Sequence, residues 1–194
     1  MTLELAREIW IGCKRKRCPV EQSRDAWTGD FPLPDIVAEY YKHVGPDELH
    51  CFDQTQLTLY LPSLRRLAEF QIGILESVTV PGRESTTSDR TWGPERLAVA
   101  IHHTCPFILD VRSGHVEFCT PGITRNAGWE PVAKLESLAE MMVFFGALES
   151  AIEGVEMYDN DGDQSSHFVP QLIEHASQYL DRSLATELLD TMYG

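Results

Sequence analysis

Histidine and cysteine side chains lie close together at three places along the chain, and these residue types can bind zinc or perform thiol chemistry. The close neighbours are His50 and Cys51, then His102, His103 and Cys105, and then His115 and Cys119. No CxxC or HxxxH spacing is present to preorganise a pair of ligands on one turn or helix. Zinc binding would therefore depend on tertiary folding alone, and we expect no metal.

Cys105 is the best placed of the five cysteines to act as a nucleophile, because two histidines stand within three residues of it. Successive residues of a strand point to opposite faces, however, which makes local pairing between them awkward. The chain has no GxSxG, no phosphate-binding glycine loop and no HExxH. We therefore predict a protein that is not an enzyme and has no cofactor.

An acidic turn, Asp159-Asn160-Asp161-Gly162-Asp163, invites comparison with a calcium loop. With Gly162 at the sixth position of an EF-hand, the first and twelfth positions are Met157 and Phe168, and neither supplies an oxygen ligand from its side chain. We interpret the segment as a solvated turn between helices.

The clearest structural pattern is a β-hairpin, whose sequence from Pro106 to Phe118 is PFILDVRSGHVEF. With Ser113-Gly114 as the turn, Val111 faces Val116 and Leu109 faces Phe118 on an apolar side. Asp110 and Glu117 then lie opposite each other on the polar side. Like charges in that position need neutralisation by Arg112, by His115 or by a basic partner, so both carboxylates are candidates for partner contact.

The elements around the hairpin indicate an α+β fold. The run from Leu97 to Ile101 is apolar on both sides, as in a central strand covered on both faces. Helical spacing of apolar residues predicts helices at Thr2–Arg17, Asp35–His43, Ser63–Gly73, Ser137–Gly154 and Pro170–Met192. The helix after Ser137 should form much of the core.

A ridge at i+4 spacing follows the last helix, through Leu172, Ala176, Leu180, Leu184 and Leu188. This ridge must be buried either on the domain or on a second copy of the chain, so a homodimer is one alternative. We expect an α+β domain over residues 1–154 and an acidic turn with an added C-terminal helix over 155–194.

The net charge of −14 is concentrated near the C-terminus. Residues 131–194 hold 12 acidic and 2 basic side chains, whereas residues 1–130 hold 18 and 14. Such a field disfavours nucleic acid and suits a basic protein partner, although an acidic surface that only maintains solubility explains the same counts. The carboxylates of Glu149, Glu153 and Glu156 are candidates for partner contact. No signal peptide or apolar membrane span is recognisable, and five scattered cysteines fit the cytosol.

Five segments together resemble the SUKH superfamily, bacterial proteins related to the yeast cell-wall assembly regulator. They are LPSLRRLAEFQIG, WGPERLAVA, PFILDVRSGHVEF, Trp129-Glu130-Pro131 and SLAEMM. The resemblance covers about Phe31 to Ala151. It implies helices packed around a twisted, mainly antiparallel sheet, and an immunity protein that neutralises a toxin. The family has no catalytic residues to carry over. Its members usually have a small or acidic, glycine-rich turn where this chain has His102 to Cys105.

The resemblance favours a cytoplasmic, non-catalytic protein-binding module, with neutralisation of a cognate bacterial toxin as its role. A scaffold or regulatory module of the same fold is the alternative, and a metal- or thiol-dependent enzyme is a third.

Overall fold

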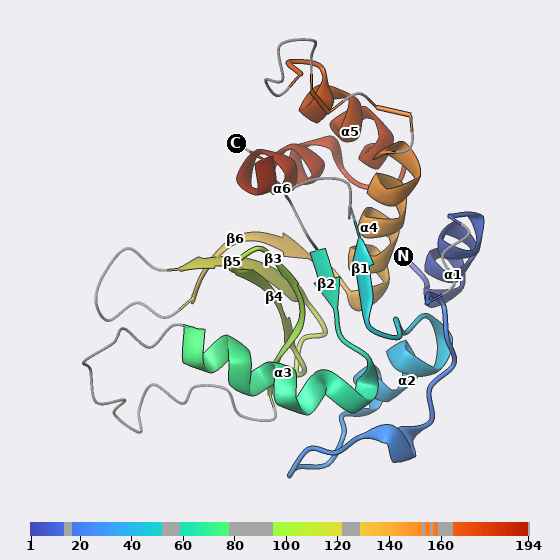
Figure 1. Ribbon diagram of the computed structural model, residues 1–194, viewed down its shortest axis with the longest axis vertical. Coiled ribbons are helices and arrows are strands. Elements are labelled where there is room, and N and C mark those ends of the chain that lie inside the picture. The colour runs from blue at the N-terminus through green and yellow to red at the C-terminus, as the bar shows by residue number, and fades with distance from the viewer. Residues whose placement is uncertain are drawn as a thin grey trace.

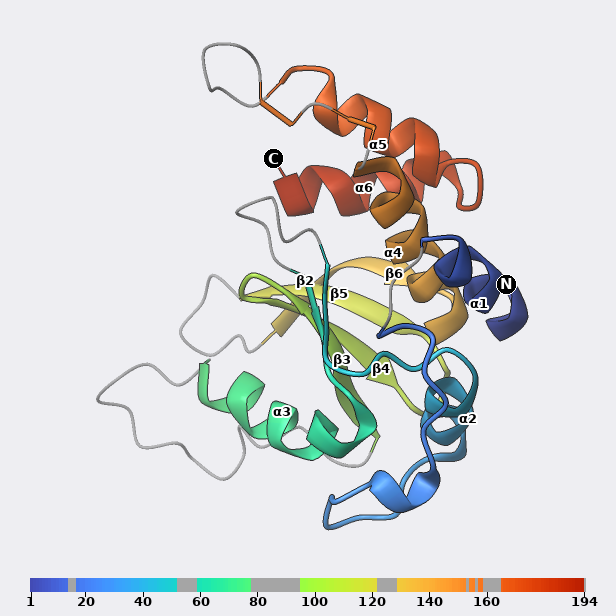
Figure 2. The same ribbon diagram turned by 45° about the vertical axis from the view of Figure 1, so that its right-hand side comes forward.

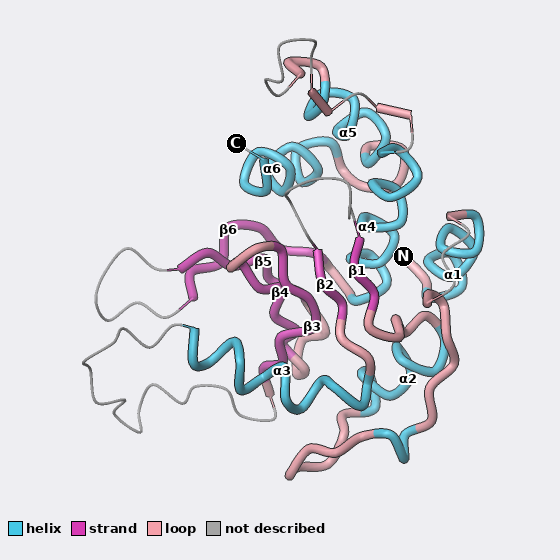
Figure 3. Tube along the Cα trace, viewed as in Figure 1, coloured by secondary structure: helices cyan, strands magenta, loops and turns pink. Residues whose placement is uncertain are grey.

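The computed structural model describes residues 1–13, 17–51, 59–77, 95–121, 129–152, 154–155, 157–158 and 165–193. Within them the strands form one six-stranded sheet in the order β1-β2-β3-β4-β5-β6, each antiparallel to the next. The strands are β1 (Leu49–Cys51), β2 (Leu59–Leu61), β3 (Arg96–His102), β4 (Cys105–Asp110), β5 (Val116–Pro121) and β6 (Trp129–Leu135). Figure 3 shows them side by side in one curved sheet.

Helices surround this sheet, which confirms the predicted α+β fold. They are α1 (Leu3–Gly12), α2 (Asp35–His43), α3 (Leu64–Ser77), α4 (Leu138–Ile152), α5 (Phe168–Ala176) and α6 (Arg182–Tyr193), with a short 3-10 turn at Arg24–Ala26. In Figure 1, α1, α2 and α4 lie together to the right of the sheet, α3 lies below it, and α5 and α6 lie above it. Figure 2 shows the same grouping from a second direction.

The central helix of the molecule is α4, as its apolar sequence predicts. Nearly every residue from Leu138 to Ala151 is buried, because α1, α5 and β6 pack against it from different sides. Ser137 begins the helix by accepting a hydrogen bond from the Glu140 backbone N–H at 3.1 Å. The Glu140 carboxylate accepts from the Glu136 N–H at 2.6 Å, which makes a capping box whose return bond comes from the residue before the N-cap.

The second helix has its predicted bounds, whereas the first, predicted over Thr2–Arg17, ends at Gly12 with Cys13 as its C-cap. Thr2 accepts a hydrogen bond from the Leu5 N–H and begins α1, which buries Ala6 and Trp10. Pro34 directly precedes α2, where a missing N–H costs nothing. Three residues of the basic run after α1, residues 14–16, lie outside the described residues.

The single helix expected over Pro170–Met192 is wrong in one respect, because the structure breaks it into α5 and α6. Asp181 accepts hydrogen bonds from the N–H groups of Ser183 and Leu184, and so begins a new helix. Most of the apolar ridge is nevertheless buried within the same chain: Leu172, Ala176 and Leu188 are fully covered, and Leu180 is 5% exposed. The ridge therefore docks on the domain, and a dimer that buries it instead has no support here.

β3 is covered on both faces, as predicted, with Leu97, Ala98, Val99 and Ala100 all buried. A bulge between Ala98 and Ala100 interrupts the alternation of side chains between the two faces of β3. As a result Leu97 and Ala100 both pair with core residues of β4, Leu109 and Phe107. β2 pairs only with the far end of β3, and the Gln71 side chain of α3 occupies the edge beyond it. Its amide accepts from the Ala98 N–H at 2.8 Å and donates to the Ala98 carbonyl at 2.9 Å.

The hairpin forms where predicted, but its register is shifted by two residues. Leu109 pairs with Val116, and Phe107 pairs with Phe118, whose rings stack with centroids 4.4 Å apart. The turn spans Val111 to His115, because the Asp110 carboxylate binds the first N–H groups after the strand. A shift of two residues leaves each side chain on the same face, so the apolar side still faces the core. Asp110 and Glu117 are no longer opposite each other.

Candidate functional site

The two hairpin carboxylates predicted to contact a partner belong to a group of charged side chains at one end of the sheet. We call this group the charged turn cluster; it comprises Glu95, Arg96, Asp110, Arg112, His115, Glu117 and Glu136. The β3–β4 and β4–β5 pairings bring its members together, since Arg96 is the cross-strand partner of Asp110 and lies 2.5 Å from the Glu117 carboxylate. Arg96 is thus the neutralising residue, and the sequence reasoning had named only Arg112, His115 or a partner.

Asp110 closes the hairpin turn. Its Oδ1 accepts the N–H of Arg112 at 2.8 Å and the N–H of Ser113 at 3.2 Å. These bonds, chiefly the one from Ser113, lower the pKa of Asp110 below its ordinary value, with Arg96 contributing. The carboxylate therefore has a structural role in shaping the turn.

The remaining charges of the cluster are also matched in pairs. Arg112 forms an ion pair with Glu95, and Nδ1 of His115 lies 3.4 Å from a carboxylate oxygen of Glu136. Lys134 is the cross-strand neighbour of Glu117 on the side away from β4. With His115 neutral, the cluster has four carboxylates against two guanidinium groups, and Lys134 beside it reduces the net charge to −1. Most of its negative charge is therefore compensated locally, which weakens its attraction for a basic partner.

The predicted acidic set on and after α4 does not form one surface in the described structure. Glu149 is 4% exposed and lies within the packed helix, so its carboxylate cannot belong to an exposed partner surface. Glu153 and Glu156 lie outside the described residues, as do residues 159–163 of the acidic turn. Burial of Glu149 follows from the packing of other helices around α4, which the sequence of α4 alone does not reveal.

His102 and Cys105 are brought together, because they are cross-strand partners at the ends of β3 and β4. Burial, and secondarily His103, lowers the pKa of His102 to about 4. Burial also raises the pKa of the Cys105 thiol, against a smaller opposite effect of Thr104. Both groups are therefore neutral at pH 7, and the thiolate–imidazolium pair that thiol catalysis requires is disfavoured.

The other candidate ligands remain apart from this pair. The His50 ring packs against Tyr60 at an interplanar angle of 41°, with centroids 4.8 Å apart, and His115 belongs to the charged turn cluster. Burial raises the pKa of the Cys119 thiol to about 12. In the described part of the chain, no three histidine, cysteine or acidic side chains gather as a metal site.

An acidic surface that the sequence reasoning did not assign lies on the C-terminal hairpin, the name we use for α5, α6 and the turn between them. Its carboxylates are Glu174, Asp181, Glu187 and Asp190, all on exposed residues. The only Lys or Arg of residues 165–193 is Arg182, and it lies 2.6 Å from Glu174. We call the three exposed carboxylates at and along α6, Asp181, Glu187 and Asp190, the acidic face; Asp181 and Glu187 line the same hollow, and Asp190 follows Glu187 by three residues in the helix. The acidic excess near the C-terminus pointed to this region, but which of its residues face solvent depends on the fold.

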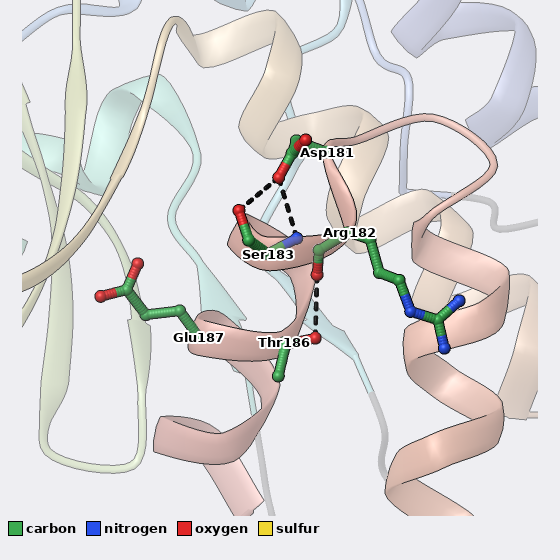
Figure 4. Close-up of a pocket in the computed structure, with 5 residues that line it drawn as sticks. All are labelled: Asp181, Arg182, Ser183, Thr186 and Glu187. Atoms are coloured by element: carbon green, nitrogen blue, oxygen red, sulfur yellow. Dashed lines mark hydrogen bonds between the residues drawn. The ribbon is translucent and has the colours of Figure 1, made fainter.

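The start of α6 has an open hollow beside the acidic face, lined by Asp181, Arg182, Ser183, Thr186 and Glu187 (Figure 4). Hydrogen bonds from Ser183 to Asp181 and from the Thr186 hydroxyl to the Arg182 carbonyl hold this first turn. The bonds from Ser183, chiefly the one from its hydroxyl, lower the pKa of Asp181. The Glu187 carboxylate has no such bond and points away from them in the figure.

Comparison with protein-family models, with curated proteins and with solved structures finds no match for this chain. No helix in the described ranges is long and apolar enough to span a bilayer.

Proposed function

We propose that the protein is a non-catalytic binding module that engages a basic protein partner through the acidic face of the C-terminal hairpin. The observation that supports this proposal is the charge of that surface. Asp181, Glu187 and Asp190 are exposed, and Arg182, the one Lys or Arg within residues 165–193, is paired with Glu174. Complementary charge of this kind accelerates association and selects partners by sign.

The specific role that we propose is immunity, the neutralisation of a cognate bacterial toxin. The resemblance of five sequence segments to the SUKH superfamily supports this role. A toxin that acts on nucleic acid would carry a cationic phosphate-binding surface, and carboxylates held on a folded helix are suited to cover such a surface.

The proposal is tested with the double variant Glu187→Gln and Asp190→Asn, because neither carboxylate accepts an assigned hydrogen bond and both are exposed. Glu8→Gln with Glu130→Gln is the matched control, since it removes the same charge from exposed residues elsewhere. Bacterial cells co-express each version of the protein with a candidate toxin encoded next to the gene of this protein, and their survival is measured. The association rate of the purified protein and toxin is then measured at low and high salt.

We expect the wild-type protein and the control to protect cells. The acidic-face variant should associate roughly 3- to 10-fold more slowly at low salt, with the difference shrinking at high salt. Equal rates for all three versions at low salt would contradict the charge mechanism. Binding without protection would favour the scaffold alternative over immunity.

A further inference from the structure

The C-terminal hairpin packs chiefly on α4 and β6, and its last helix also reaches the far end of β3, where His102 contacts Tyr193. His102 is 2% exposed and pairs with Leu59 on β2. Its ring centroid lies 5.7 Å from that of Tyr193, near the end of α6, at an interplanar angle of 60°. The Tyr193 ring lies 5.4 Å from that of Phe168, at the start of α5. Three aromatic side chains therefore connect the sheet to both helices of the hairpin.

The polar atoms of this junction are buried without hydrogen bonds. Neither Nε2 of His102 nor Oη of Tyr193 has a hydrogen-bond partner. The contact therefore depends on apolar and aromatic packing, which a neutral imidazole tolerates. An imidazolium in the same place would be a buried cation without compensation, which is far more costly.

The titratable groups around His102 supply no compensating charge. His103 is the next residue in the sequence, Cys105 faces His102 from β4, and Tyr193 faces it from α6. Burial raises the pKa of Tyr193, and Cys51 on β1 adds to the rise, so this phenol stays neutral. No carboxylate of the described residues contributes to the pKa of His102, and His103 lowers it further.

We propose that the C-terminal hairpin is an acid-releasable element, docked on the sheet while His102 is neutral and freed when this imidazole takes up a proton. Release exposes His102 to water, where an imidazolium is well solvated. The undocked state thus binds the proton more tightly, and falling pH shifts the population toward it. Taking about 4 for the docked and 6.5 for the undocked ring, the docked-to-undocked ratio falls about 8-fold between pH 7 and pH 5.5.

Two carboxylates also stabilise the C-terminal hairpin, but they act at lower pH. Glu174 pairs with Arg182, and Asp181 begins α6; both have a pKa below their ordinary values of 4.5 and 3.8. Their stabilisation is complete well above those ordinary values and is lost only as pH falls through them. The interval from pH 7 to pH 5.5 therefore lies above the range in which these two carboxylates act.

Hydrogen exchange of backbone amides tests the proposal on the full chain at pH 7 and pH 5.5, after correction for intrinsic exchange rates. In the wild type, protection of α5 and α6 should fall about 8-fold relative to protection of β4 and β5. His102→Leu removes the titrating group and should reduce this relative change to less than about 2-fold. His175→Gln removes an exposed histidine from α5 and should behave as the wild type.

An equal loss of protection in the C-terminal hairpin and in the sheet would overturn the proposal. A His102→Leu variant that loses as much relative protection in acid as the wild type would also overturn it. If that variant does not fold, a nuclear magnetic resonance titration of His102 in the wild type decides the matter. A ring pKa of about 5 or less supports the proposal, and any higher value overturns it.

Discussion

His103 lies in the turn between β3 and β4 and has a φ of 54°. This is the left-handed backbone region, which residues other than glycine rarely adopt. The His103 side chain is exposed, and its ring lies nearly perpendicular to that of His102, with centroids 4.8 Å apart. The turn between β3 and β4 thus has a strained backbone.

We predict that His103→Gly increases the free energy of unfolding by about 1 kcal/mol, because glycine adopts this conformation without the Cβ clash. Gly114→Ala is the opposite control, since Gly114 has a φ of 80° and a Cβ there would lie 3.3 Å from Ile36. It should destabilise by about 1 kcal/mol or more. Urea unfolding of the three proteins measures both effects, and destabilisation by His103→Gly would contradict the prediction.

At the scale of single elements, β3 depends on a side chain for part of its hydrogen bonding. The amide of Gln71 binds both the N–H and the carbonyl of Ala98 and also donates to the Leu67 carbonyl at 2.9 Å. It thereby replaces a strand on the stretch of edge that β2 does not reach. Neutral hydrogen bonds of this kind matter most because their loss leaves buried backbone groups unsatisfied.

Gln71→Leu should therefore lower the free energy of unfolding by about 2 kcal/mol or more. Gln71→Glu keeps the acceptor for the Ala98 N–H but loses the donor to the Ala98 carbonyl. Its destabilisation should be similar to that of Gln71→Leu at neutral pH and smaller at low pH, where the protonated acid can donate. Gln171→Leu, at an exposed position of α5, is the control and should change stability by less than about 0.5 kcal/mol. A Gln71→Leu effect no larger than this control would refute the role of the amide.

Elements with a strong local signal could be predicted from the sequence, and elements defined by tertiary contacts could not. The pattern of α4, the bounds of α2 and the burial of Leu97 to Ala100 follow from local apolar spacing. The break between α5 and α6 was missed because the i+4 ridge keeps its period across it, although Asp181 is a recognisable N-cap. The hairpin register was missed because the Asp110 side chain, rather than Ser113-Gly114, determines where the turn begins.

The candidate site was harder to predict than the fold, because exposure and charge pairing arise from contacts between distant segments. Arg96 lies 21 residues from Glu117 in sequence, yet it neutralises this carboxylate. Glu149 is of a residue type usually found at the surface, but it is buried where other helices pack around α4. The acidic excess of the C-terminal region was visible, but its exposed members could be recognised only after the helices were placed.

At the scale of the whole molecule, α4 connects the N-terminal and C-terminal helices with the sheet. It packs tightly on α1 at Gly146, where a Cβ would lie 2.6 Å from Cγ2 of Ile9 and 3.2 Å from Nε1 of Trp10. The small residue allows Trp10 to be fully buried and to donate a hydrogen bond to the Met142 carbonyl at 2.8 Å.

Gly146→Ala should consequently force α1 away from α4 and lower the free energy of unfolding by about 1–3 kcal/mol, despite the better helix propensity of alanine. Gly12→Ala is the control, because a Cβ at that position of α1 has no atom within 4 Å. Thermal unfolding followed by Trp fluorescence measures the difference. Equal melting temperatures for the two variants would show that α1 adapts without cost.

The Trp10–Met142 contact also has a consequence for synthesis of the chain on the ribosome. The two residues are separated by 132 positions, so at about 5–20 residues per second α1 emerges roughly 7 to 26 s before the carbonyl that it binds. During that interval the side of this helix that packs on α4 has no native surface to cover it. The nascent chain therefore presents Trp10 to chaperones or to neighbouring chains until α4 has been made.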